Sequence, residues 1–144
     1  MAYLEGGYYK NGKLRREIYI EWAKEQAKIL AEAGMTRAAL RRFYAQIKGL
    51  QPLMKDEKAF EENKHKLYPI IPLANYATNK KEGKVPIVFK NFIERNIELA
   101  LENRDNFIAF VEHFQSIVAY FKEADQKDSR SKNQKAMNKK TFHK

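Results

Sequence analysis

Apolar residues recur at helical spacing along most of the chain, and this pattern divides it into successive helices. We expect the first helix over residues 14–33 and the second over residues 36–50. A third runs from about residue 53 to 76. Pro69 and Pro72 predict a kink or a break within it, because proline lacks the amide proton that a helix interior needs. The residues that mark the ends of the first two helices are Gly34, Thr36, Gly49 and Pro52.

Two further helices are expected in the second half of the chain. Pro86 suits the first turn of a helix that runs to about residue 101, and the last helix spans about 106–124. Apolar positions cover about half the circumference of this last helix, which is wider than the usual single stripe. It therefore lies either at the centre of a bundle, the interpretation we favour, or against a partner. Since no alternating run is long enough for a convincing strand, the sequence predicts an all-α fold, a compact bundle of about five helices.

The chain divides by composition into three parts. Residues 1–13 contain three of the six glycines and predict a flexible leader, residues 14–123 form the bundle, and residues 124–144 predict a disordered basic tail. The first residues lack the basic start and apolar stretch of a secretory signal, and no apolar run approaches the roughly 20 residues of a membrane span. The absence of cysteine excludes disulfides and thiolate metal sites. We therefore expect a cytoplasmic protein.

The charge adds a first indication of function, because 28 Lys and Arg against 18 Asp and Glu give a net charge of +10. A domain this basic is expected to meet polyanions, either nucleic acid or an acidic membrane surface. The tail alone holds seven basic and two acidic residues, so half of the excess lies there. Because tail charge is often merely solubilising, the position of the other half is more informative.

Residues that could carry catalysis or hold a metal are sparse. His65 follows Glu62 at the Glu-x-x-His spacing of di-iron bundles, but such a site needs a second pair, which the sequence lacks. Glu112 and His113 are adjacent, hence about 100° apart on a helix, and cannot hold one ion together. The sequence also lacks a glycine-rich phosphate loop, a supported Ser-His-Asp set and an acidic cluster suited to magnesium. We therefore expect no enzyme, no cofactor and no metal site.

The second predicted helix carries the clearest charge signal. Residues 35–54 include no acid. At about 100° per residue, Arg37, Arg41 and Lys48 form a basic stripe along one flank of the apolar seam, over about 16 Å, enough to follow several phosphates. Arg42 falls on the far side of the helix. The stripe predicts phosphate binding, and a surface that merely keeps the protein soluble is the alternative.

Two other features are candidates for RNA contact. Tyr44, at the border of the stripe, could stack on a base, although a tyrosine in this position more often lies at the edge of the core. Residues 78–84 are expected to form a loop with a single acid and three lysines, Lys80, Lys81 and Lys84. The loop charge makes these lysines candidate phosphate ligands.

Residues 30–43 also have the look of a DNA-binding helix-turn-helix, with a small residue and a glycine before a capped, basic helix. The first helix, of about 19 residues, is longer than such motifs generally use. The polar groups on the second helix, three arginines with Gln46 and Lys48, suit phosphates better than base edges. A helix-turn-helix regulator is therefore kept as an alternative.

Three segments of the chain share a resemblance to one family. Residues 36–44, Thr-Arg-Ala-Ala-Leu-Arg-Arg-Phe-Tyr, resemble the T-x-S-Q-L-R-x-F-Y signature of the small subunit of type III-A CRISPR effector complexes, the Csm complex. Residues 72–80 resemble the family's P-K-L-A-Y-A-A-G-R segment, and residues 110–122 its closing F-x-x-F-x-x-I-V-A-Y-H-K helix. The segments agree in order and spacing, and together they span about residues 14–123. The departures are Ala38-Ala39 for Ser-Gln, Leu73 for Lys, Lys80 for Arg and Phe121 for His.

The resemblance implies a non-catalytic, RNA-binding role. Copies of this small bundle stack into a filament beside the guide RNA, help to hold the target RNA, and contact the backbone and large signature subunits. The implied partners are thus guide RNA, target RNA, other copies of the chain and those subunits, with no membrane. Arg41 and Tyr44 fall on family motif positions, and Lys80 takes the place of an arginine. Phosphates would be neutralised without reading of bases. The equivalent small subunit of type III-B complexes is a related alternative.

Overall fold

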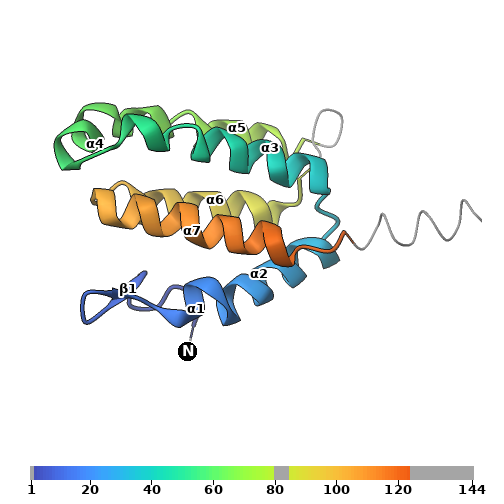
Figure 1. Cartoon of the computed structure of the whole chain (residues 1–144). Helices are drawn as coiled ribbons and strands as arrows, with labels where there is room; N and C mark the ends of the chain where they lie inside the picture. The colour runs from blue at the N-terminus through green and yellow to red at the C-terminus, as the bar shows by residue number, and fades with distance from the viewer. Residues whose placement is uncertain (1, 80–84, 124–144) are drawn as a thin grey trace, which may run out of the picture.

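Helices make up most of the residues that the computed structural model describes, which are 2–79 and 85–123 (Figure 1). No helix within these ranges combines the length and hydropathy needed to cross a lipid bilayer. The predicted tail, residues 124–144, lies outside them. In chain order the elements are β1 Tyr9–Lys10, β2 Lys13–Leu14, α1 Arg16–Tyr19, α2 Glu21–Glu32, α3 Arg37–Lys48, the 3-10 turn η1 Gln51–Leu53, α4 Glu57–Asn63, the 3-10 turn η2 Lys64–Leu67, α5 Ile70–Tyr76, α6 Ile87–Ala100 and α7 Arg104–Tyr120.

The helices stack in three layers, with α6 and α7 in the middle (Figure 1). The hairpin, α1 and α2 lie on one side of this pair, and α3, α4 and α5 lie on the other. The central α7 packs against α1 and α2, against α3 and α4, and against α6. Its buried side chains are Phe107, Ala109, Phe110, Val111, His113, Phe114 and Ile117. The all-α bundle is thus confirmed, and so is the central position of its last helix.

The helix ends follow the local chemistry of the sequence. Gly34 takes φ +93°, a left-handed conformation that glycine adopts without steric cost. The amides of Gly34 and Met35 donate to the carbonyls of Ala31 and Leu30, which closes the end of α2 in a Schellman motif. Two residues on, the hydroxyl of Thr36 accepts the amide of the third residue of α3 at 3.2 Å. These two caps fix the short connection between α2 and α3.

Two of the predicted helices are interrupted. The expected break at Pro69 is confirmed, because α5 starts directly after this proline and places Pro72 in its first turn, where a missing amide proton is harmless. The first predicted helix, residues 14–33, is also divided, at Ile20, whose φ of −120° and ψ of −83° are not helical. The apolar pattern did not predict this second break, which separates α1 from α2.

The expectation of a flexible leader is wrong for residues 2–13, which pack on the bundle. Leu4 and Tyr8 are each only 1% exposed. Asn11 and Gly12 have φ of +54° and +77°, the type I′ turn that joins two strands of a hairpin, and β1 pairs with β2 on either side of it. Each strand has only two residues, so this hairpin is a small addition to an all-α fold.

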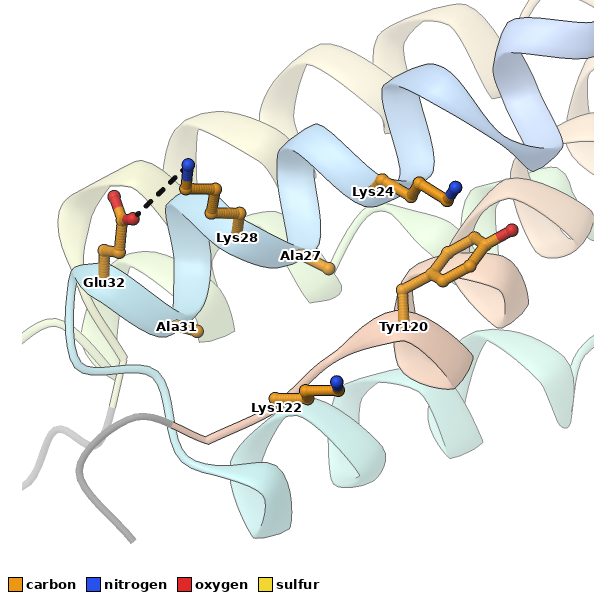
Figure 2. A pocket seen from close by; sticks show the side chains of 7 residues that line it. All are labelled: Lys24, Ala27, Lys28, Ala31, Glu32, Tyr120 and Lys122. Carbon is orange, nitrogen blue, oxygen red and sulfur yellow. Dashed lines mark ion pairs between the residues drawn. The ribbon is translucent and has the colours of Figure 1, made fainter. Parts of the chain in front are cut away.

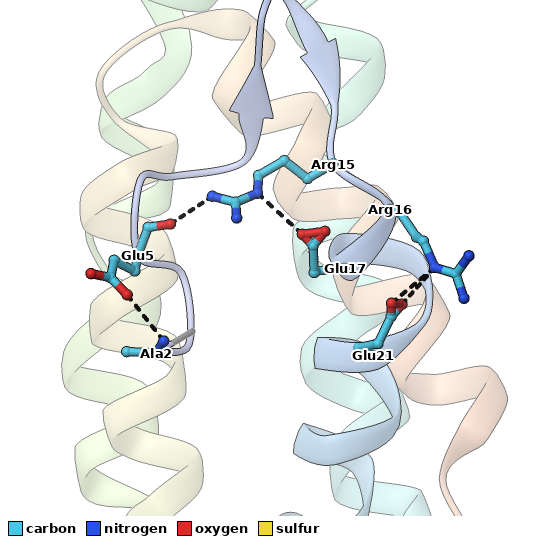
Figure 3. A network of polar contacts seen from close by, with 6 residues as sticks. All are labelled: Ala2, Glu5, Arg15, Arg16, Glu17 and Glu21. Atoms are coloured by element: carbon cyan, nitrogen blue, oxygen red, sulfur yellow. Dashed lines mark hydrogen bonds and ion pairs between the residues drawn. The ribbon is translucent and has the colours of Figure 1, made fainter.

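A buried arginine ties the first residues to α1 (Figure 3). The Arg15 Nη1 donates to the carbonyl of Glu5 at 2.6 Å, and its Nε lies 3.4 Å from a carboxylate oxygen of Glu17. The guanidinium carbon also lies 4.8 Å from the centre of the Trp22 ring. Arg15 is 7% exposed, so its guanidinium stabilises the fold and is not accessible to a ligand.

A chain of buried hydrogen bonds holds the same residues to α6 and α7. The Tyr8 hydroxyl donates to Asn96 Oδ1 at 2.7 Å, and Asn96 Nδ2 donates to the Tyr3 hydroxyl at 3.1 Å. That hydroxyl lies 2.8 Å from His113 Nε2, and His113 Nδ1 lies 2.7 Å from the carbonyl of Ile18. Since a carbonyl only accepts, Nδ1 carries the proton and Nε2 accepts from Tyr3. Every member of this network has a partner, which removes the cost of burying it.

Candidate nucleic-acid interface

Helix α3 presents one apolar face to the core and one polar face to solvent. Ala39, Leu40, Phe43 and Ile47 are buried, and the helix packs on α7. The Phe43 ring meets Phe89 of α6 edge-on, with ring centres 4.9 Å apart. This packing fixes the rotation of α3, so the residues between the apolar positions must point outward.

The outward face of α3 carries cations and small residues. Arg41, Arg42 and Lys48 are exposed, and the exposed Ala38 and Ala45 lie between the two arginines around the helix. Within the described part of the chain, neither Arg41 nor Arg42 has a hydrogen bond or an ion pair. The Lys48 ammonium donates to the Gln51 side chain at 2.7 Å, a neutral partner that leaves its charge uncompensated. Three positive charges therefore face solvent on a helix that contains no acid.

Arg37 has a different role from the other predicted cations. Its Nη2 donates to the carbonyl of Phe121 at 3.0 Å, and its guanidinium carbon lies 5.7 Å from the centre of the Phe121 ring. Its backbone amide donates to a carboxylate oxygen of Glu123 at 3.0 Å. Arg37 thus fastens the end of α7 to the beginning of α3. The helical wheel placed it in the exposed stripe because a contact between residues 84 positions apart leaves no trace in the local pattern.

Tyr44 lies at the edge of the core. Its ring packs edge-on against Phe114, with ring centres 5.5 Å apart, and its hydroxyl is 3.4 Å from the Gln115 side chain. Partial burial raises the pKa of the Tyr44 hydroxyl, with a smaller contribution from Glu112. This is the arrangement expected of a core-edge aromatic, and stacking on a base stays a prediction.

The other predicted site residues are only partly described. Lys80, Lys81 and Lys84 lie outside the described residues, so their role stays a prediction. The helical wheel placed Arg42 on the side of the helix away from the apolar seam, and Arg42 is exposed there. The small, exposed residues Ala38 and Ala45 lie between Arg42 and Arg41 around the helix, so the two arginines belong to one outward face.

The arrangement of α2 and α3 differs from a helix-turn-helix. Each packs on α7, one on either side of it, rather than mainly on the other (Figure 1). A recognition helix presents its N-terminal residues to base edges. The start of α3 is instead covered by residues 121–123, and the Glu123 carboxylate at this end would repel a phosphate backbone.

The histidines offer no reactive group among the described residues. His113 is buried with both ring nitrogens engaged, and desolvation lowers its pKa to about 4. His65 is exposed, as is Glu62. In residues 2–79 and 85–123, no three histidines, aspartates or glutamates gather in a way that could hold a metal ion.

Comparison with known proteins gives one family. A family model described as Csm2 Type III-A matches residues 14–127, well over half of the chain. No curated protein and no solved structure matches. The matched range contains all of α1 to α7 and the whole outward face of α3.

Proposed function

Because the chain belongs to the Csm2 Type III-A family, and is thus a small subunit of a type III-A CRISPR complex, we propose that it holds RNA there without catalysing a reaction. Membership in this family sets aside the helix-turn-helix regulator and the type III-B small subunit. The proposal needs no cofactor, and it places the protein where the RNA-guided complex works, in the cytoplasm.

The observation that carries the proposal is the outward face of α3. Arg41, Arg42 and Lys48 provide three solvent-facing charges along a rigid helix, and no acid on that helix competes with a phosphate. Arginine binds phosphate through a planar fork of donors, and lysine binds it as a point charge. Ala38 and Ala45 leave room for a nucleic-acid backbone to approach between the arginines. Such contacts neutralise phosphates and carry no information about base identity.

The proposal assigns guide and target RNA as partners, with sequence selection left to base pairing between them. Protein partners, including further copies of the chain in a filament, need an apolar surface as well. Large hydrophobic side chains are exposed on α5 and at the beginning of α6: Leu73 is 40% exposed, Tyr76 58% and Ile87 65%. We propose that these side chains contact neighbouring subunits, because exposed apolar surface is typical of protein-interaction sites.

The test is the affinity for single-stranded RNA of a variant with Arg41→Gln, Arg42→Gln and Lys48→Gln, measured over a salt series. We expect weaker binding, and a salt dependence whose slope falls by about 0.7 for each phosphate that the variant no longer neutralises. A variant with Lys10→Gln, Lys13→Gln and Lys66→Gln removes three exposed charges elsewhere and is the matched control. An equal decrease in affinity for both variants would show that net charge, not α3, binds the RNA.

A further inference from the structure

A groove of about 410 Å³ lies between α2 and the end of α7 (Figure 2). Its floor is apolar and consists of Ala27 and Ala31 of α2 together with the ring of Tyr120. The two alanines are buried, whereas 38% of Tyr120 is exposed. The volume falls within the range of roughly 300–1,000 Å³ that is usual for small-ligand sites. The floor is therefore apolar, and its exposed part is chiefly the ring of Tyr120.

The rim of the groove is positively charged. Of its three lysines, Lys28 extends toward Glu32, with Nζ 4.0 Å from a carboxylate oxygen (Figure 2). The Lys24 Nζ lies 5.5 Å from the centre of the Tyr120 ring. Lys122 lies beyond the same ring, on the segment that follows α7 (Figure 2). Lys24 and Lys122 thus flank one exposed aromatic ring, and the Glu32 carboxylate on the rim pairs with Lys28.

The combination specifies the chemistry of a ligand. An exposed tyrosine ring on an apolar floor can stack on a planar ring. The flanking ammonium groups require negative charge at the edge of that ring. A nucleotide has both properties, a planar base and an attached phosphate. The remainder of the chain after residue 123 is a poor occupant, because residues 124–144 carry seven basic and two acidic residues and would be repelled by the lysines.

The groove is continuous with the start of α3. Arg37 at the start of α3 binds the carbonyl of Phe121, and Lys122 is the next residue on the groove side. Arg41 follows Arg37 by about 6 Å along the helix axis. The end of α2, the end of α7 and the start of α3 all lie at the same end of the bundle (Figure 1). A phosphate backbone that joins the groove to the outward face of α3 must therefore run clear of the Glu123 carboxylate, which lies at the start of α3 and would repel it.

We propose that this groove binds one nucleotide of a single RNA strand, with the base on Tyr120 and its phosphates between Lys24 and Lys122. The inference rests on the proposed RNA-binding function and adds a stacking contact to it. The outward face of α3, as defined by Arg41, Arg42, Lys48 and the two alanines, contains no aromatic ring. The outward face of α3 would hold the strand by charge alone, and the groove would hold it by charge and stacking.

The experiment measures binding of the full chain to a ten-nucleotide adenosine RNA, by fluorescence anisotropy over a salt series. Tyr120→Leu keeps an apolar side chain and removes the aromatic face, and we expect affinity to fall about five-fold or more. Tyr19→Leu is the matched control, because Tyr19 is 37% exposed and lies outside the groove, and it should bind as the parent does. Lys24→Gln with Lys122→Gln should lower the salt slope by about 1.4.

The result that overturns the inference is parental affinity in both the Tyr120→Leu variant and the double lysine variant. If the α3 variant loses affinity in the same assay, the proposed function stands and only the groove is wrong. If the α3 variant and both groove variants bind as the parent, both proposals fail. Tighter binding of a glutamate-rich peptide containing phenylalanine than of the RNA would identify the groove as a protein-docking site and would also overturn the inference. Circular dichroism of each variant confirms that it is folded.

Discussion

Acidification should destabilise the protein through one buried histidine. His113 is fully buried, and its Nε2 accepts a hydrogen bond from Tyr3. A second proton on the ring would be placed on Nε2, where it would disrupt that bond and create a charge with no water near it. Desolvation accordingly lowers the pKa of His113 to about 4, whereas an exposed histidine in the unfolded chain has a value of about 6.5.

The magnitude and sign follow from this difference. Between pH 6.5 and 4 the unfolded chain binds a proton that the folded protein does not, so the free energy of unfolding decreases as the pH falls. The slope is about 1.4 kcal/mol per pH unit, and the full difference of about 2.5 units corresponds to about 3 kcal/mol. Between pH 7.5 and 5.0 we expect this one group to remove about 2 kcal/mol. Above pH 6.5 its contribution is constant.

Urea unfolding of the parent and of His113→Gln, at intervals from pH 7.5 to 5.0, measures the effect. The difference between the two slopes isolates His113 from the carboxylates, which both proteins share. Because the variant loses stability at every pH, the parent is also followed directly by NMR titration of the His113 ring. A ring that titrates near pH 6.5 in the folded protein would refute the reasoning, since the buried hydrogen bond would then not exclude the second proton.

Two further substitutions test the assignments that depend on long-range contacts. Arg37→Ala should lower the free energy of unfolding by about 1.5–3 kcal/mol, because the Phe121 carbonyl loses a charged donor. Arg41→Ala should change the free energy of unfolding by less than about 0.5 kcal/mol. Thermal unfolding of the two variants compares these effects directly. Tyr8→Phe should lower the free energy of unfolding, measured in urea, by about 1–3 kcal/mol, because Asn96 Oδ1 loses its hydrogen-bond donor in the core. An unchanged free energy of unfolding would mean that the Tyr8 hydroxyl does not hold the first residues to α6.

The sequence predicts those features of the fold that local chemistry decides. Gly34 ends α2 and Thr36 starts α3 because one residue supplies a left-handed conformation and the other a hydroxyl acceptor, and neither depends on distant residues. The break at Pro69 has the same local origin. The central place of α7 was predictable because its apolar residues exceed the area that a single neighbour can cover.

Contacts between distant segments explain what the sequence did not predict. The glycine-rich composition of the first residues predicts flexibility, but the hydroxyls of Tyr3 and Tyr8 form hydrogen bonds with residues more than 85 positions away in the sequence. The Asn11-Gly12 pair is a local signal for a hairpin, but strands of two residues are too short to show an alternating pattern in the sequence. At the interface, a helical wheel identified Arg41 and Lys48 as exposed.

The wheel failed for Arg37 because the end of α7 covers the first turn of α3, which a pattern confined to one helix does not contain. It placed Arg42 correctly on the side of α3 away from the apolar seam, about 100° from Arg41, and this side is the exposed one. Tyr120 and its flanking lysines come from two helices and the segment after them, so no sequence window brings them together.

We propose that the chain holds single-stranded RNA by its phosphates, without reading bases. The most direct measurement is the affinity of the full chain for two single-stranded RNAs of unrelated sequence and for duplex DNA, each over a salt series. We expect similar affinities for the two RNAs, weaker binding to the duplex, and a linear fall of log affinity with log salt concentration. A strong preference for one RNA sequence or for the duplex, or an affinity that does not respond to salt, would contradict it.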